Sequence, residues 1–172
     1  SYLVICLGML FYYCEYLLRV SPSVMHSELM AHYRINDFQL ANLIATYYYV
    51  YAPMQLPVGL IADKYGPFLS MTVACLLCSL GTYLFVGTET LLVAKLGRFF
   101  VGLGSAFAFV CVLKMAALFV PKHFSLISGI TMGLGQLGAM SGDVVFTYFI
   151  SRMPWQYVNV QAARAGLLLT LL

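Results

Sequence analysis

Charged residues are scarce in this sequence, at 9% of the total, whereas an ordinary soluble domain has roughly 25%. The formal net charge is only +3 and no basic run is present, so nothing in the sequence indicates a nucleic-acid partner. Extended polar stretches are also missing, and we expect no soluble domain within these residues. Because 62% of the residues are hydrophobic, a chain of 172 residues could not hide them all from water, and lipid is the expected solvent.

Clusters of the residues that enzymes and metal sites need are missing too. The five cysteines all fall in apolar stretches, and Cys75 and Cys78 are interpreted as packing residues because no His or second Cys pair lies near them. The three histidines fall in expected loops, and there is no nucleophile–base pair or phosphate-binding loop. We therefore expect a protein that is not an enzyme and that needs no metal or other cofactor.

Apolar runs long enough to cross a bilayer, about 20 residues each, recur along the chain. They predict an all-α membrane protein with helices at about 2–24, 38–62, 68–86, 91–119 and 124–150, and an incomplete sixth at 157–172. No basic region or cleavage site accompanies the first run, which is therefore predicted to be a membrane helix and not a signal peptide. Lys and Arg are balanced between the two sets of loops, so their distribution does not give the orientation.

The connection between the second and third predicted helices has a distinctive pattern, Gly59-Leu60-Ile61-Ala62-Asp63-Lys64-Tyr65-Gly66. Gly59 would let the second helix approach a neighbour closely, and Asp63 would cap the next helix. Lys64 would reach the headgroup region, and Gly66 would permit a tight turn. On these physical grounds alone, the pattern also suits any capped helical hairpin.

The same pattern resembles the G-x-x-x-D-[R/K]-x-G signature of the major facilitator superfamily, which lies in a cytoplasmic loop between helices 2 and 3. Arg98, Gly102 and Gly104 resemble that family's helix-4 motif R-x-x-x-G-x-G, and Pro154-Trp155-Gln156 resembles the Gly-Trp-Arg that opens helix 6. The run 124–150 is rich in glycine, as the family's fifth helix is. The resemblance covers nearly the whole chain but only the amino-terminal six-helix bundle of a twelve-helix fold.

The resemblance implies a secondary active transporter that works by alternating access with a carboxyl-terminal bundle of the same protein. Its solute would be a small polar metabolite, either an organic anion or an amino acid, and a proton is the expected coupling ion. The amino terminus is then expected in the cytoplasm and the chain in a cell inner membrane. The stretch 12–22 looks closest to uptake permeases of intracellular gammaproteobacteria. An exporter of the same superfamily and a non-transporting half-transporter, acting as a structural or regulatory partner, are the alternatives.

Six charged residues fall inside the predicted spans, where an isolated charge costs about 2.5–3.5 kcal/mol at the bilayer centre. They are Glu15, Arg19, Arg98, Lys114, Asp143 and Arg164. At 1.5 Å per residue, four of them are expected at a similar depth, where they could pair: Glu15, Arg98, Asp143 and Arg164.

For these charges the sequence allows both functional and structural roles. The resemblance makes Arg98 a candidate for proton coupling, and a structural salt bridge to Asp143 or Glu15 is the alternative. Glu15 and Arg19 are spaced to form a local helix pair, but the family often has a helix-1 arginine that meets an anionic substrate. Asp143 is a candidate proton carrier and Arg164 a candidate solute contact, while Lys114 is expected to extend toward the cytoplasmic headgroups.

Tyrosine is concentrated in the second predicted helix. Tyr47, Tyr51 and Gln55 recur every four residues, so one stripe could line a central solute cavity, and packing is the alternative role. Pro53 and Pro57 are expected to kink this helix.

Overall fold

The structure is a computed structural model that describes residues 2–170. Throughout that range its regular elements are helices, separated by short turns. They are α1 (Tyr2–Val24), α2 (His26–Tyr33), α3 (Asp37–Met54), α4 (Val58–Tyr65), α5 (Pro67–Val86), α6 (Leu91–Phe119), the 3-10 helix η1 (Pro121–His123), α7 (Phe124–Ile150) and α8 (Trp155–Thr170).

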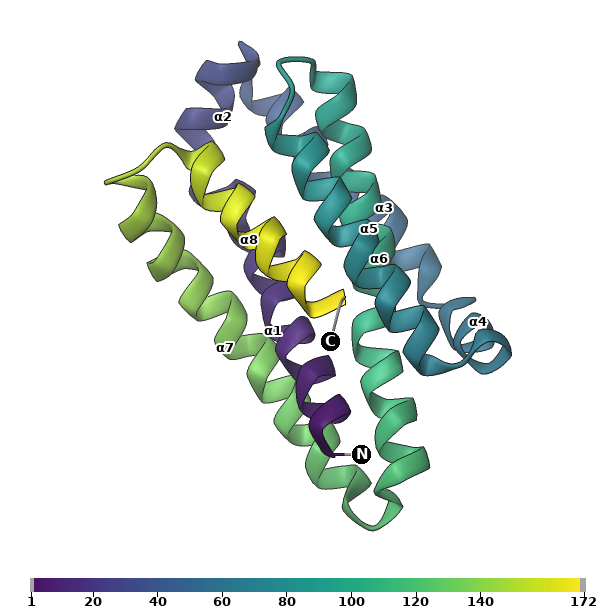
Figure 1. Cartoon of the computed structure of the whole chain (residues 1–172). Coiled ribbons are helices and arrows are strands. Elements are labelled where there is room, and N and C mark those ends of the chain that lie inside the picture. Colours follow the sequence, from purple (N-terminus) through teal and green to yellow (C-terminus); the bar gives the residue numbers. More distant parts are fainter. Residues whose placement is uncertain (1, 171–172) are drawn as a thin grey trace.

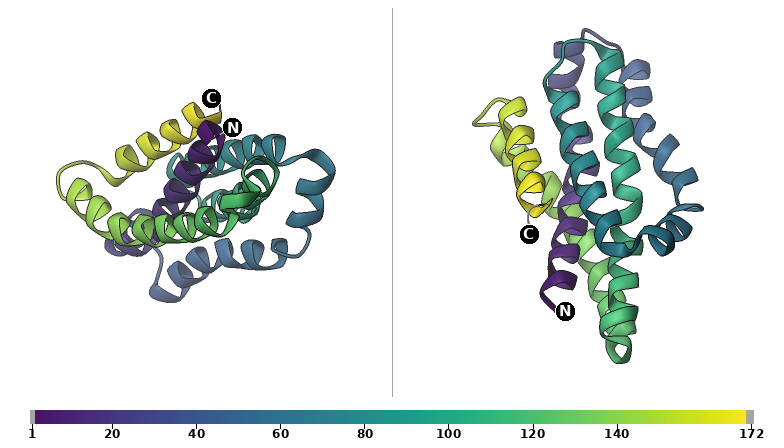
Figure 2. Two further views of the ribbon diagram at one scale, coloured as in Figure 1. Left: turned by 90° about the horizontal axis from the view of Figure 1, so that it is seen from below. Right: turned by 45° about the vertical axis from the view of Figure 1, so that its right-hand side comes forward.

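The long helices form an elongated bundle around α6 (Figure 1). α6 packs against α5, α3 and α1, while α7 lies along α1 and α8 lies along α5. Both views of Figure 2 show α3 and α4 on the opposite side of the bundle from α8. α2 and the turns that follow α5 and α7 gather at one end, which we call the α2 end. α4, η1 and the start of α1 lie toward the other end.

Two glycines of α6 allow its neighbours to approach closely. A β-carbon at Gly104 would lie 2.5 Å from the carbonyl oxygen of Ala74 on α5. One at Gly102 would lie 2.5 Å from the carbonyl oxygen of Tyr47 on α3. Since real β-carbons do not approach so closely, a side chain at either position would force α6 away from its partner.

Three helices of the described range are long and apolar enough to cross a membrane: α1, α5 and α6. The second predicted span is divided, because α3 ends at Met54 and α4 begins at Val58. A kink was expected here, and the structure instead has a break that ends at Pro57, which cannot donate a helical hydrogen bond. α8 covers the predicted sixth span only to Thr170, and residues 171–172 lie outside the described residues.

The segment 26–37, expected to be a loop, contains α2. Leu29 and Tyr33 of α2 and Met25, the residue just before it, recur every four positions, and all three are buried. The Tyr33 hydroxyl donates to the carbonyl oxygen of Phe85 at 2.5 Å, and burial raises the pKa of Tyr33 to about 12. His32 lies 3.1 Å from the carbonyl oxygen of Thr88, and its ring is 5.2 Å from that of Trp155. α2 is therefore tied both to the turn after α5 and to the start of α8.

Candidate functional site

The interior of the bundle holds an ion pair on α1. Glu15 is fully buried, and the guanidinium of Arg19 lies one turn further along, with Nη2 at 3.0 Å and Nε at 3.2 Å from Oε1 of Glu15. Tyr47 of α3 donates its hydroxyl to the same oxygen and accepts a bond of 3.0 Å from Nε of Arg19. We call these three residues the central polar cluster.

The two oxygens of the Glu15 carboxylate differ in their hydrogen bonding. The hydrogen bonds from Arg19 and Tyr47 all go to Oε1, while Oε2 is buried and forms no hydrogen bond of normal geometry within residues 2–170, although the Ser105 side chain lies close to the carboxylate. A buried acceptor with no donor is costly, because it has lost water and gained nothing in return. A proton on Oε2 would neutralise the carboxylate and weaken its attraction for Arg19.

Tyrosine rings surround the guanidinium of Arg19. Its central carbon lies 4.2 Å from the centre of the Tyr16 ring and 4.7 Å from that of Tyr51, and Tyr51 stacks on Tyr47 at 5.5 Å. The Arg19 side chain keeps 14% of its surface exposed, whereas that of Glu15 keeps none. Arg19 is thus the member of this ion pair that is partly open to the surroundings, and the rings stabilise its charge by cation–π attraction.

Arg98 of α6 is buried beside this cluster. Its Nη1 donates to the carbonyl oxygen of Leu18 at 3.1 Å, and its central carbon is 5.0 Å from the Tyr47 ring. Nε and Nη2 have no partner among the described residues, and Arg98 forms no ion pair there. The predicted salt bridge from Arg98 to Glu15 or Asp143 is therefore wrong for this structure. Tyr47 lies between Glu15 and Arg98 and contacts both.

The predicted pairing of Asp143 and Arg164 within a buried layer of charge is also wrong. Asp143 on α7 and Arg164 on α8 are both exposed, and neither forms an ion pair within the described residues. Depth was inferred from helix length, but direction depends on rotation of about 100° per residue. Gly142 and Ala163 face the interior, so the residue that follows each of them points elsewhere. A role for Asp143 and Arg164 stays a prediction.

The stripe Tyr47, Tyr51 and Gln55 runs from the interior to the surface. Tyr47 is buried, Tyr51 is half-buried, and Gln55 is exposed in the break after α3. Sequence reasoning missed Tyr12 and Tyr16 of α1, whose hydroxyls are 3.2 Å apart. Their spacing of four residues, continued three residues later by Arg19, was the available signal.

The pattern at residues 59–66 forms a contact with α6. Asp63 pairs with Nζ of Lys114, which also donates to the carbonyl oxygen of Gly59 at 2.6 Å. Asp63 was expected to cap the next helix, but it lies inside α4, and Gly66 occupies the position before α5. Gly59 was expected to allow close helix packing, yet a β-carbon there would meet nothing within 4 Å.

Gly66, Lys64 and the ion-pair partner Lys114 differ in how far they follow the predictions made for them. Gly66 has φ of +85°, which favours glycine and confirms the predicted tight turn. The ammonium of Lys64 lies 5.3 Å from the Tyr65 ring. Lys114 was expected to extend toward lipid headgroups, and instead it holds α4 against α6.

A narrow gap, with no room for a water molecule, lies beside Arg98 between α1, α5, α6 and α8. Asn159 is buried there and donates to the carbonyl oxygen of Trp155 at 2.9 Å, while its Oδ1 has no partner among the described residues. Ser21 and Thr82 also line the gap. The sequence analysis missed Asn159, which it placed in an incomplete helix without weighing its amide.

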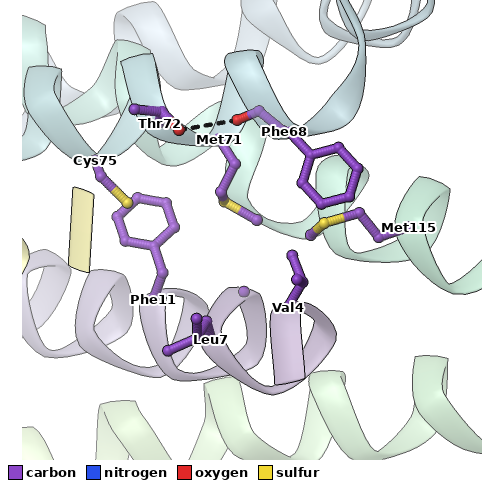
Figure 3. A pocket seen from close by; sticks show the side chains of 9 residues that line it. Val4, Leu7, Phe11, Phe68, Met71, Thr72, Cys75 and Met115 are labelled. Atoms are coloured by element: carbon purple, nitrogen blue, oxygen red, sulfur yellow. Dashed lines mark hydrogen bonds between the residues drawn. The ribbon is translucent and has the colours of Figure 1, made fainter. Parts of the chain in front are cut away.

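The pocket in Figure 3 lies between α1, α5 and α6, away from the central polar cluster. It has a volume of about 150 Å³ and is lined by Val4, Leu7 and Phe11 on one side and by Phe68, Met71 and Cys75 on the other. The hydroxyl of Thr72 donates to the carbonyl oxygen of Phe68 and is thereby occupied. With no charged group in its lining, this pocket is unsuited to a polar solute.

Comparison with known proteins gives a consistent family. Residues 4–172 match the Major Facilitator Superfamily. The chain is 26% identical over 158 residues to "Uncharacterized transporter YybO" of Bacillus subtilis (strain 168), covering 91% of this chain and 36% of that protein. It is 28% identical over 166 residues to "Probable sulfoacetate transporter SauU" of Cupriavidus necator, covering 95% of this chain and 38% of that protein. The chain thus spans between a third and two fifths of the length of these relatives. Matched over nearly all of its residues, the chain belongs to the major facilitator superfamily.

Proposed function

We propose that this chain is the amino-terminal bundle of a secondary active transporter that takes up a small organic anion or an amino acid together with a proton. The observation that carries the proposal is the central polar cluster, in which a reachable arginine is held by one buried carboxylate. The relative described as a probable sulfoacetate transporter supports an anionic solute. The resemblance of the α1 sequence to uptake permeases supports import.

In this proposal Arg19 binds the anionic group of the solute. A guanidinium presents several N–H groups in one plane and pairs with carboxylates through two parallel hydrogen bonds. The aromatic rings of Tyr16 and Tyr51 keep it in place without using those donors fully. Tyr51 and Gln55 lie farther along the same side of α3 and would add neutral hydrogen-bond donors for the rest of the solute.

The proton is carried by Glu15. When Glu15 is ionised, it holds Arg19 at 3.0 Å, and when it is protonated, Arg19 is released to the solute. Proton and anion binding then favour each other, because each removes the competing partner of the other. Arg98 supports this step as a second buried cation that Tyr47 links to Glu15. Asp143 is retained as a second candidate proton carrier and Arg164 as a second solute contact.

Alternating access requires a carboxyl-terminal bundle of the same protein, with which this bundle would rock about a central site. The α4 segment, held to α6 through Asp63 and Lys114, would contact that second bundle on the cytoplasmic side. In the proposed orientation the chain lies in a cell inner membrane, with its amino terminus in the cytoplasm and its α2 end on the outer side. An exporter would use the same cluster in reverse, and a half-transporter without transport would move no solute at all.

The test is uptake into proteoliposomes by the full-length transporter, with a panel of organic acids, sulfonates, amino acids and sugars, with and without an inward proton gradient. Accumulation of one or more anions only under the gradient is the expected result. Outward movement alone would support the exporter, and no movement of any solute would contradict transport. An Arg98→Ala variant that kept full gradient-driven uptake would remove the role given to Arg98.

A further inference from the structure

A second groove lies between α1, α7 and α8, on a side of the bundle that the central polar cluster does not reach. Its volume is about 380 Å³, and it is lined mainly by Leu17 of α1, Phe146 and Phe149 of α7, Met153 of the turn after α7, and Val158 and Ala162 of α8. The groove is therefore apolar, and it extends from the last turns of α7 to the first turns of α8.

Several of its lining side chains are open to the surroundings. Val145, Phe149 and Met153 are 37%, 40% and 43% exposed, and Tyr157 at the start of α8 is 51% exposed. In a membrane-spanning bundle such a surface faces lipid or another protein segment. A polar solute would find no charged group in the lining, where only Tyr157 and Gln161 offer polar atoms.

Positive charge is placed at one end of the groove. Arg152 follows the last turn of α7, next to the lining residue Met153, and its guanidinium carbon lies 4.3 Å from the Tyr148 ring. Arg152 is exposed and forms no ion pair among the described residues. At this end, the α2 end, the chain turns from α7 into α8, and a bundle that crosses a bilayer would have lipid headgroups near such an end. An exposed arginine there is complementary to a phosphate group.

We propose that this groove binds one phospholipid, with an acyl chain between α7 and α8 and the phosphate against Arg152. An apolar groove suits an acyl chain, and a single exposed cation beside it suits a phosphodiester. Solute transport is not needed for this binding, so the site is independent of the proposed function.

Native mass spectrometry of the full-length transporter tests the proposal, using detergent-purified protein with added phosphatidylglycerol or with diacylglycerol that has the same acyl chains. Wild-type protein should retain one phosphatidylglycerol and bind diacylglycerol about tenfold more weakly, because the phosphate contact is lost. Val145→Trp fills the groove and should abolish retention. Its matched control is Val144→Trp, at a neighbouring residue that is 70% exposed and outside the groove lining.

Arg152→Gln tests the headgroup contact without changing the packing, and it should weaken phosphatidylglycerol retention about tenfold. Its control is Lys122→Gln, which removes an exposed cation in η1 at the other end of the bundle. Equal retention by Val145→Trp and Val144→Trp would overturn the proposal, and so would equal retention by Arg152→Gln and wild type. Photo-crosslinking from position 157 to a second protein copy, with no lipid adduct, would overturn it as well.

Discussion

The ring of Tyr47 lies 5.0 Å from the guanidinium carbon of Arg98. Its hydroxyl, at the far end of the same ring, donates to Glu15. One side chain of α3 therefore touches both the buried acid and the buried base, which do not pair directly. Tyr47 of α3 therefore links a side chain of α1 to a side chain of α6.

Tyr47→Phe tests this link. The ring and its cation–π contact remain, but Glu15 loses a donor and Arg19 loses an acceptor, so the folded state should lose about 1–3 kcal/mol. Gradient-driven uptake should fall with it. Thermal unfolding and proteoliposome uptake measure the two effects. Tyr49→Phe is the matched control, because Tyr49 is 67% exposed on the same helix, and it should behave as wild type.

Glu15→Gln should separate proton coupling from solute movement. The amide cannot take up or release a proton, so accumulation under a proton gradient should be lost while exchange of solute between equal concentrations continues. Exchange should also become independent of pH, since no carboxylate at this position titrates. Glu89→Gln, at an exposed residue in the turn before α6, serves as the control. A Glu15→Gln protein that still accumulates solute against a gradient would show that another group carries the proton.

Lys114→Met should change transport more than stability. Its partner Asp63 is 72% exposed, and such ion pairs contribute at most about 1 kcal/mol to folding. Loss of the contact between α6 and α4 should nevertheless lower the turnover rate, with the apparent solute affinity unchanged. Lys114→Arg should restore much of the rate. The proposed role for α4 would be wrong if the Met and Arg variants turned over at equal speed.

Gly102→Ala and Gly133→Ala form a matched pair on different helices. A β-carbon at Gly102 would lie 2.5 Å from the Tyr47 carbonyl oxygen, so overpacking should cost about 1–3 kcal/mol and disturb the central polar cluster. A β-carbon at Gly133 meets nothing within 4 Å, and there alanine should stabilise α7 by roughly 0.5–1 kcal/mol. Thermal unfolding of both variants checks the opposite signs.

Much of the fold follows from the sequence because long apolar runs have few ways to exist in lipid. α1 and α6 have the same bounds as the apolar runs at 2–24 and 91–119. α2 was missed because its residues are mixed in polarity, and only the spacing of its buried side chains indicates a helix. The break before α4 was underestimated, since the effect of Pro57 depends on whether neighbours hold the helix together.

The candidate site was predicted in composition but not in geometry. Glu15, Arg19, Tyr47 and Arg98 were all identified, because charges and hydroxyls in an apolar run stand out. Their partners were not, since pairing depends on which way each helix is rotated. Asp143 and Arg164 lie one position away from interior-facing residues, and that single step directs them to the surface. Lys114 illustrates the same limit, because its partner Asp63 comes from a helix that was not expected to be separate.

The attachments of α2 restrict how this end of the protein can open. Tyr33 connects α2 to the end of α5, while His32 connects it to the turn after α5 and also contacts the beginning of α8. Contacts therefore hold α2, the end of α5 with its following turn, and the start of α8 together. Bending one of these helices alone would break several of the contacts at once. Spin labels placed on α2 and on α8 should therefore keep a fixed separation through the whole cycle. In the proposed transport cycle, distances should change only between this bundle and the proposed carboxyl-terminal bundle, because this bundle would move as a rigid body.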